Sequence, residues 1–429
     1  MGSDGESRPR AAGAGAEEDR RMTRAPLRAD RSAMITGIGA VTPLGNDFDT
    51  IAAALLAGRS GVVEIDSAGF SREARQFAAP VAAIPAVAAN NSLGRLGRLC
   101  LSAAHAARAD AGLGDLRGGP VAAARVGLVL GIGAEQLKGW EADFLAGGRQ
   151  VFSPDRPPSL VHRMATHLGI DGPAVTVAAA CASSGYALAL ARRWIAMGLV
   201  DVCLAGGGDI LSPTGFAAFY NLRALSRRSD DPVRASRPFD RDRDGFVMGE
   251  GSAVLVLEAR LHAESRGARV RGELAGVGMS GDATHMVIPS DDPTEAARSI
   301  QLALLDAGVT PAGIDYVNAH AAGTPVGDVA EAAAIRLALG RAADGIPVSS
   351  TKSMSGHLVS AAAAFEALAC LAAIDRQTIP PTLNLDHPDP RCRLDHVPHV
   401  ARPHPVAVTA SNSFGFGGAN LCLVIRRAA

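Results

Sequence analysis

Residues 174–185, AVTVAAACASSG, decide how this chain is expected to fold. Residues 175–177 are β-branched and form a short apolar run, which is typical of a buried strand. The small residues that follow allow a sharp turn, and residues 186–197 then show helical spacing up to Gly198. Cys181 is therefore expected where a buried strand meets a helix. A helix N-terminus stabilises a thiolate, so we expect a lowered pKa for this thiol.

Two interpretations of Cys181 follow from this stretch alone. The cysteine is either a nucleophile at a strand–helix junction or one more small residue of the core, as free cysteines usually are. Both remain open at this point.

Composition limits the function classes. A chain of 429 residues is long enough for two or three packing units, with 48% hydrophobic and 20% charged residues. The net charge of -1 and the absence of a basic stripe argue against a nucleic-acid partner. The six cysteines form no CxxC or metal-like pairs, which predicts free thiols, no metal site and a cytoplasmic location. They are Cys100, Cys181, Cys203, Cys370, Cys392 and Cys422.

Strand and helix patterns alternate along the chain, which predicts a layered α/β fold with buried sheets. Residues 1–32 have no apolar periodicity and are expected to be a disordered leader, with the first strand opening at Ala33. Further strands are expected at residues 125–133, 201–210 and 253–257, a helix at 47–57, and a polar loop at 226–250. The apolar segment after Gly356 is short, rich in alanine and interrupted by Glu366, so it predicts a buried helix rather than a membrane span.

The second half of the chain repeats this plan. Strands are expected at residues 270–279, 314–318 and 346–351, with a helix at 293–307. The strand–turn–helix pattern around CASSG at 181–185 coincides with that around KSMSG at 352–356. We therefore predict an internal duplication, with one half at residues 33–265 and the other at 266–429. Two such halves place Cys181 from one turn, and Lys352 and His357 from the other, at a common pocket.

Rare polar residues lie at the ends of the expected strands. Only two of the 42 basic residues are lysines, Lys138 and Lys352, so a lysine that remains is a candidate for a site that needs a compact ammonium group. For Lys138 chance is the simpler explanation. His320 follows a strand as Cys181 does, although a lone histidine there is more often a core residue. The glycine-rich run NSFGFGG at 412–418 offers backbone N–H groups that can hold an oxyanion.

Seven motifs, taken in this order, carry a resemblance that covers the chain from Ala33 onward. They are TGIGAVTPLG, AAACASSG, RPFDRDRDGFVMGEG, GMSGDATHM, VNAHAAGTP, SSTKSMSGHL and NSFGFGGAN. Together they resemble the elongating β-ketoacyl-[acyl carrier protein] synthases, the condensing enzymes of fatty acid and polyketide synthesis. The resemblance implies the thiolase-like fold, in which two duplicated halves form α/β/α/β/α layers.

The same resemblance implies roles for the polar residues. Cys181 would accept an acyl chain from a carrier protein, and His320 and His357 would promote decarboxylation of a malonyl extender. Lys352 would hold the histidines in their working charge state. The backbone N–H groups of Cys181 and Phe416 would form the oxyanion hole, with Phe416 as a gate.

Less specific similarities concern the pocket and its partners. An acyl or pantetheine pocket is implied at Ile132, Thr324, Phe414 and Gly417. Carrier-protein docking is implied at Arg223, Arg227 and Arg228. The enzyme is expected to bind no cofactor of its own, because the phosphopantetheine belongs to the carrier protein. The expected partners are an acyl carrier protein and either a second copy of this chain or a paralogous subunit that sets chain length.

Three departures from the family's motifs alter the surroundings of these groups. Residues 321–323 are Ala-Ala-Gly, so Ala322 replaces a threonine that commonly binds the pantetheine arm. The nucleophile turn is CASS rather than CTSG, and Ser360 and Ala363 stand where glycine is common. They favour a specialised pathway over housekeeping fatty acid synthesis. Two alternatives remain: a non-catalytic chain-length subunit, against which Cys181 argues, and a degradative thiolase, which would need a second cysteine in the NSFGFGG turn.

Overall fold

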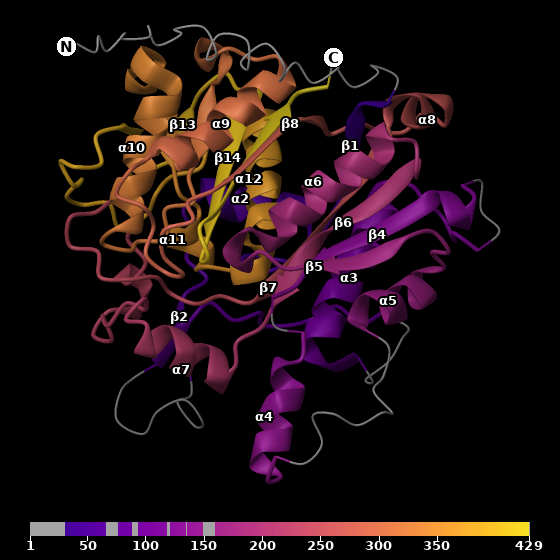
Figure 1. Ribbon diagram of the computed structural model, residues 1–429, viewed down its shortest axis with the longest axis horizontal. Helices are drawn as coiled ribbons and strands as arrows, with labels where there is room; N and C mark the ends of the chain where they lie inside the picture. Colours follow the sequence, from indigo (N-terminus) through magenta and orange to yellow (C-terminus); the bar gives the residue numbers. More distant parts are fainter. Residues whose placement is uncertain are drawn as a thin grey trace, which may run out of the picture.

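Strands from both halves of the chain meet in one large sheet in this computed structural model (Figure 1). The structure describes residues 31–65, 76–87, 93–117, 121–133, 135–148 and 159–428. Residues 1–30 of the expected leader thus lie outside the described residues. Arg31, which the sequence places in that leader, already contacts the folded chain: its guanidinium donates to the Val200 carbonyl oxygen and pairs with Asp201.

The order of the strands repeats between the two halves. It is β5-β4-β6-β7-β1 in the first half and β10-β9-β14-β15-β8 in the second. Numbered along each half, both orders are third, second, fourth, fifth, first. The bounds are β1 (Ala33–Val41), β4 (Val126–Gly131), β5 (Ala174–Val177), β6 (Val202–Asp209), β7 (Gly251–Ala259), β8 (Gly272–Gly281), β9 (Tyr316–Asn318), β10 (Pro347–Ser349), β14 (Val408–Gly415) and β15 (Ala419–Arg426).

Strand directions repeat as well. In each half the third, second and fourth strands run parallel, and the fifth pairs antiparallel with both the fourth and the first. The halves are joined where β1 meets β8, through Met34 opposite Glu273 and Ile35 opposite Gly272. Identical order and direction confirm the predicted duplicated α/β architecture.

Helices fill the layers between and outside the two halves of the sheet. Helices α6 (Ser183–Ala196) and α12 (Ala362–Arg376) share one apolar core with residues from both halves. Helices α3 (Gly94–Asp110) and α5 (Leu160–Leu168) form a second core on the outer face of the first half. Helices α9 (Thr294–Ala307) and α10 (Gly327–Leu339) form a third core on the second half. This is the expected α/β/α/β/α arrangement (Figure 1).

The remaining elements are short. They are α2 (Phe48–Leu56), α4 (Leu137–Leu145), α7 (Pro213–Asn221), α8 (Arg260–Ser265), α11 (Lys352–Ser355), β2 (Val63–Ile65), β3 (Gln76–Ala78), β11 (Thr378–Ile379), β12 (Asp395–His396) and β13 (Arg402–Pro403). Helix α2 begins after Asp47, whose side chain accepts from the Thr50 N–H as an N-cap. The predicted helix there is confirmed.

The helix after Gly356 is buried on all sides. Every residue of α12 from Ala362 to Ile374 is buried, Glu366 included, as the apolar pattern predicts. Within the described residues, no helix is long and apolar enough to cross a membrane.

Strand β5 differs from its expected burial. The β-branched residues 175–177 do form a strand, but they are only half-buried, because β5 is the last strand at its end of the sheet. Periodicity detects the strand but not its position in the sheet. The prediction of burial at this strand is therefore wrong.

Candidate active site

Cys181 lies in a tight turn, residues 180–182, between β5 and α6. Ala180 has a φ of 47°, a left-handed conformation that costs about 1–3 kcal/mol for a residue other than glycine. The Ser183 hydroxyl braces the turn, because it accepts from the Ala179 N–H at 2.9 Å and donates to the Ala180 carbonyl at 2.7 Å. The turn therefore holds the cysteine at the start of the central helix.

The glycine-rich loop approaches this turn closely. A Cβ on Gly415 would lie 2.7 Å from the Ala179 carbonyl oxygen, so only glycine fits there. The approach brings the Phe416 N–H into hydrogen-bonding contact with the Cys181 sulfur. A backbone donor thus lies at the sulfur, and the oxyanion hole expected from the N–H groups of Cys181 and Phe416 stays a prediction.

Burial dominates the ionisation of Cys181. Its side chain is 4% exposed, and burial raises the pKa of the thiol to about 12, against opposing effects of the Lys352 charge and the Phe416 N–H. The expectation of a lowered thiol pKa, based on the helix N-terminus, is therefore wrong for the free enzyme. The resting group is a thiol that must lose its proton to react.

Two histidines line the same cavity as Cys181, a space of about 320 Å³. His320 follows β9 and His357 follows α11, and their rings stand 5.4 Å apart, edge to face at 83°. Burial, and then the Lys352 charge, hold the pKa of both rings well below 6.5. Both are neutral imidazoles at neutral pH.

The backbone selects the tautomer of His357. Its Nδ1 accepts the Val359 N–H at 3.3 Å, so the neutral ring carries its proton on Nε2. His320 Nδ1 is buried, with no hydrogen-bond partner among the described residues.

Lys352 is not among the residues that line the cavity in the described chain, and it pairs with Glu366 of α12. Both side chains are almost completely buried, and the Ser413 hydroxyl adds a contact to the carboxylate at 3.5 Å. Burial raises the pKa of Glu366 to about 7 despite the adjacent ammonium group. Lys352 therefore acts on the cavity through its charge rather than by contact.

A second buried carboxylate supports the His320 backbone. Glu331 accepts the N–H groups of His320 at 2.8 Å and Ala321 at 2.6 Å, and an N–H of the Asn412 amide at 3.1 Å. Burial raises the pKa of this carboxyl to about 7. One side chain thus connects the His320 segment to the strand that leads into the glycine-rich loop.

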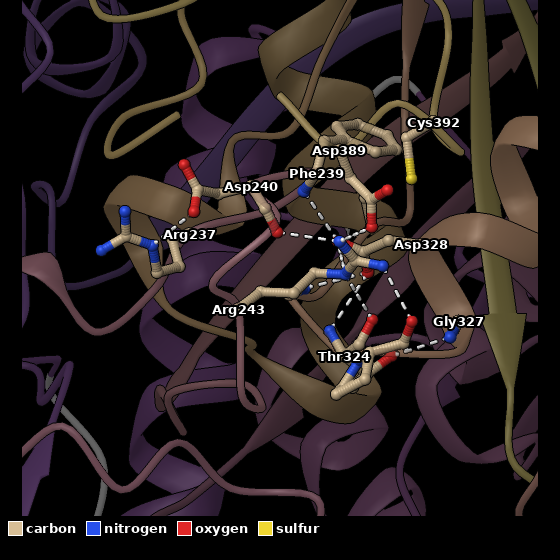
Figure 2. Close-up of polar contacts among 12 residues, drawn as sticks. Arg237, Phe239, Asp240, Arg243, Thr324, Gly327, Asp328, Asp389 and Cys392 are labelled. Atoms are coloured by element: carbon tan, nitrogen blue, oxygen red, sulfur yellow. Dashed lines mark hydrogen bonds and ion pairs between the residues drawn. The ribbon is translucent and has the colours of Figure 1, made fainter. Parts of the chain in front are cut away.

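The loop RPFDRDRDGFVMGEG of the first half holds the next part of that segment (Figure 2). The buried Arg243 guanidinium donates to the carbonyl oxygens of Thr324 at 2.9 Å and Pro325 at 2.8 Å. Asp328 accepts the Gly323, Thr324 and Phe239 N–H groups and lies 3.6 Å from Arg243.

The same loop holds the His357 backbone. The His357 N–H donates to the Val247 carbonyl at 2.7 Å, and the Gly249 N–H donates to the His357 carbonyl at 2.9 Å. One segment of the first half therefore holds the backbone of His357 and that of residues 323–325, which follow His320.

The structure gathers most of the residues predicted for the site around one cavity. It is lined by Cys181, His320, His357, Thr324, Phe414, Phe416 and Arg223. Gly417 lies beside it and donates its N–H to the Met286 carbonyl at 2.8 Å. Ile132 is instead buried in the outer core of the first half, apart from the lining of this cavity in the described chain.

The three arginines predicted to dock a carrier protein have different surroundings. Arg223 is exposed at the cavity, with a φ of 55°. Arg227 lies over the Tyr220 ring at 5.9 Å and lines a separate space of about 210 Å³. The Arg228 guanidinium donates to the Asp242 carbonyl.

Sequence reasoning assigned no role to Glu331, Glu366 or Phe246. Phe246 packs edge-on against the His357 ring, with centroids 5.1 Å apart. Glu366 had a usable signal, because an acid inside an otherwise apolar helix requires a buried partner. Glu331 had none, because its partners, two backbone N–H groups and the Asn412 side chain, meet only in the fold.

The departures at the two turns lie close to one another. A Cβ on Gly185 would lie 2.5 Å from Leu421 Cδ2 and 3.1 Å from the Ala363 Cβ, so the glycine makes room for both side chains. The Ser184 hydroxyl accepts the Ala364 N–H at 3.1 Å. Ala322 lines the cavity with a methyl group, and the Thr324 hydroxyl accepts the N–H of Gly327, the first residue of α10, at 3.2 Å.

Comparison with known proteins agrees with this geometry. Residues 30–263 match the model of the β-ketoacyl synthase N-terminal domain, and residues 271–386 match that of the C-terminal domain. The 3-oxoacyl-[acyl-carrier-protein] synthase 2 of Synechocystis is 40% identical over 405 residues, which are 92% of this chain and 97% of that protein.

Solved structures show the same similarity. A ketosynthase in complex with the acyl-carrier protein of its type II polyketide synthase superposes with a TM-score of 0.84 at 31% identity, covering 94% of this chain and all of that one. The ishigamide ketosynthase/chain length factor superposes with a TM-score of 0.84 at 33% identity, covering 93% and 100%. From the motifs, the duplicated sheet and these matches, we conclude that the chain belongs to the β-ketoacyl synthase family.

Proposed function

We propose that the protein joins an acyl chain held on Cys181 to a malonyl unit carried by an acyl carrier protein, with loss of CO₂. The single observation that carries this proposal is the shared cavity, in which a buried thiol faces two neutral imidazoles and the Phe416 N–H. The product is a 3-oxoacyl thioester longer by two carbons.

The first step is acyl transfer. The Cys181 sulfur attacks the carbonyl carbon of the incoming thioester, and the pantetheine thiol leaves with the proton that Cys181 loses. The Phe416 and Cys181 N–H groups stabilise the negative oxygen of the tetrahedral intermediate. The Lys352 charge favours the thiolate, because it lowers a thiol pKa that burial raises to about 12.

The second step is decarboxylation. The C–C bond to the malonyl carboxylate breaks, CO₂ leaves, and the electron pair forms an enolate on the thioester oxygen. A neutral imidazole with its proton on Nε2 can donate to that oxygen, and the Val359 N–H selects this form of His357. His320, also neutral, is the second donor.

The third step forms the new bond. The enolate carbon attacks the acyl-Cys181 carbonyl, the oxyanion again lies against the backbone N–H groups, and the Cys181 thiolate leaves. The scheme needs no metal and no cofactor held by the enzyme, because the phosphopantetheine arrives with the carrier protein.

Partners and pathway follow from the relatives. We propose docking of an acyl carrier protein at Arg223, and pairing with a second copy or a paralogous chain-length subunit in the cytoplasm. The methyl group of Ala322 in the cavity wall favours a specialised product over housekeeping fatty acids. Restored growth of a strain that lacks its housekeeping synthase would contradict this choice of pathway.

The central test is acyl loading of the full chain. Wild type incubated with an acyl-carrier thioester should gain the mass of one acyl group, and a Cys181→Ala variant should gain none. The matched control is Cys203→Ala, which removes a buried cysteine of β6. Loading that persists without Cys181 would overturn the proposal.

A further inference from the structure

The turn that follows His357 is strained. Val359 has a φ of 46°, a left-handed conformation that β-branched residues rarely adopt. This conformation aims the Val359 N–H at His357 Nδ1. The turn and the histidine tautomer therefore depend on one another, and something outside the turn must hold the strained backbone.

Ser360 connects that turn to the first half of the chain. Its N–H donates to Asp209 Oδ2 at the end of β6, at 3.1 Å. Its hydroxyl oxygen accepts the Gly133 N–H beyond the end of β4, at 2.9 Å, and the hydroxyl also hydrogen-bonds the Asp209 carboxylate. Three hydrogen bonds thus fix the residue that follows the strained one.

Asp209 is itself held in place. Its Oδ1 accepts the Ile210 N–H at 2.9 Å, and its Oδ2 faces the Ser360 backbone. Strand β6 runs so close to the turn that a Cβ on Gly207 would lie 2.8 Å from the Ser360 carbonyl oxygen. The carboxylate is therefore a fixed acceptor on a central strand, and the Ser360 side chain is 1% exposed.

We propose that Ser360 and Asp209 are positioning residues for His357. By holding Val359 in its strained conformation, they keep the backbone N–H on Nδ1, and so keep the proton of this cavity-lining histidine on Nε2. Ser360 stands where glycine is common in the family, so this chain has a hydrogen-bonding side chain at a position that usually has none. The effect on catalysis rests on the proposed function; the effect on the tautomer does not.

The direct test is the tautomer of His357 in the intact protein. Nitrogen NMR of protein labelled at histidine separates a protonated from an unprotonated ring nitrogen, and a His357→Gln variant assigns the signal. Wild type should show an unprotonated Nδ1. Ser360→Ala and Asp209→Asn should each show a mixture of the two tautomers. An unchanged signal in both variants would overturn the proposal, whatever the activity.

The kinetic test measures decarboxylation of malonyl-carrier protein separately from acyl loading of Cys181. Ser360→Ala should lower kcat for decarboxylation about tenfold, the worth of about one hydrogen bond, and change KM less than twofold. The matched control is Ser299→Ala, which removes a buried hydroxyl of α9 that donates to the Ala296 carbonyl. An equal loss in the control would show that stability alone is responsible.

A double variant distinguishes the loss of the turn's conformation from a general folding defect. Glycine adopts positive φ without strain, so a Val359→Gly turn needs less support from Ser360. Val359→Gly/Ser360→Ala should therefore regain most of the rate and the single tautomer that Ser360→Ala loses. No recovery in the double variant would contradict the role assigned to strain. Wild type that fails to load an acyl group would instead count against the proposed function and leave the NMR result to decide the tautomer.

Discussion

Replacing Lys352 by methionine should separate stability from catalysis. In wild type, burial raises the pKa of Glu366 to about 7 from an ordinary 4.5, even beside the ammonium group. Without Lys352 this folded-state pKa rises further, and at pH 7.5 the carboxyl takes up a proton instead of remaining an unpaired buried charge. Because pH 7.5 lies only about half a unit above the wild-type pKa of Glu366, this protonation lowers the free energy of unfolding by only about 0.7 kcal/mol relative to wild type.

The sign of the pH dependence follows from the raised pKa. When the pKa of a carboxyl is higher in the folded than in the unfolded protein, the free energy of unfolding falls as pH rises from the unfolded pKa to the folded pKa. In wild type the loss ends near pH 7, where Glu366 ionises. In Lys352→Met the pKa of Glu366 is higher, so this loss of stability continues above pH 7. Relative to wild type, the free energy of unfolding should therefore fall by about 1.4 kcal/mol per pH unit above pH 7.

Catalysis should respond far more strongly. Lys352 opposes the burial that raises the pKa of Cys181, and each unit of further increase lowers the thiolate fraction tenfold. Single-turnover acyl loading, measured by intact mass at pH 7.5, should therefore slow by at least about tenfold. Urea unfolding on the same samples measures stability. Unchanged loading in folded Lys352→Met would refute the reasoning.

Two companion variants control the experiment. Glu366→Gln leaves the buried ammonium group without its partner and should cost about 3–5 kcal/mol, much more than Lys352→Met. The double variant Lys352→Met/Glu366→Gln has no titrating carboxyl at this position. Its stability should lose the extra slope above pH 7, while its acyl loading stays slow.

Three further outcomes are expected. Arg223→Glu should raise the KM for a carrier protein about tenfold at low salt and less at high salt. Arg227→Glu should raise this KM less, because the Arg227 side chain lies on Tyr220. Equal effects of the two variants would contradict docking at Arg223 rather than Arg227. Decarboxylation should slow as pH falls below about 7, because protonation weakens the hydrogen bonds of the Glu331 carboxylate, and Glu331→Gln should remove that inflection from the pH–rate profile. Gly131→Ala should destabilise the fold by about 3 kcal/mol, measured by urea unfolding, since its Cβ would lie 2.3 Å from the Ser183 backbone. Gly139→Ala in α4 should not destabilise the fold, because there is open space around that glycine.

The sequence predicted most of the elements because their signals are local. Residue spacing located α2 and α12 and the strands that precede Cys181 and His320. Comparing CASSG with KSMSG indicated the duplication, which the repeated strand order confirms. The burial of β5 was wrong, because a strand pattern carries no information about which neighbours the strand has.

Within the site, residue identity predicted which groups meet but not their charge. Cys181, His320 and His357 were expected together, and they line one cavity. The helix N-terminus suggested a lowered thiol pKa, whereas complete burial raises it. Desolvation depends on every atom packed around the sulfur, and no short motif contains that quantity.

The sequence by itself thus determined the duplicated α/β plan and which polar residues meet at one cavity, since periodicity, residue type and motifs are properties of short segments. Only the tertiary structure decided what those residues do at rest. It pairs Lys352 with Glu366, keeps both imidazoles neutral and selects the Nε2 proton of His357 through a strained turn. The physical reason is that burial and hydrogen-bond partners arise from segments more than a hundred residues apart, such as Asp209 and Ser360, that meet only when both halves of the chain fold together.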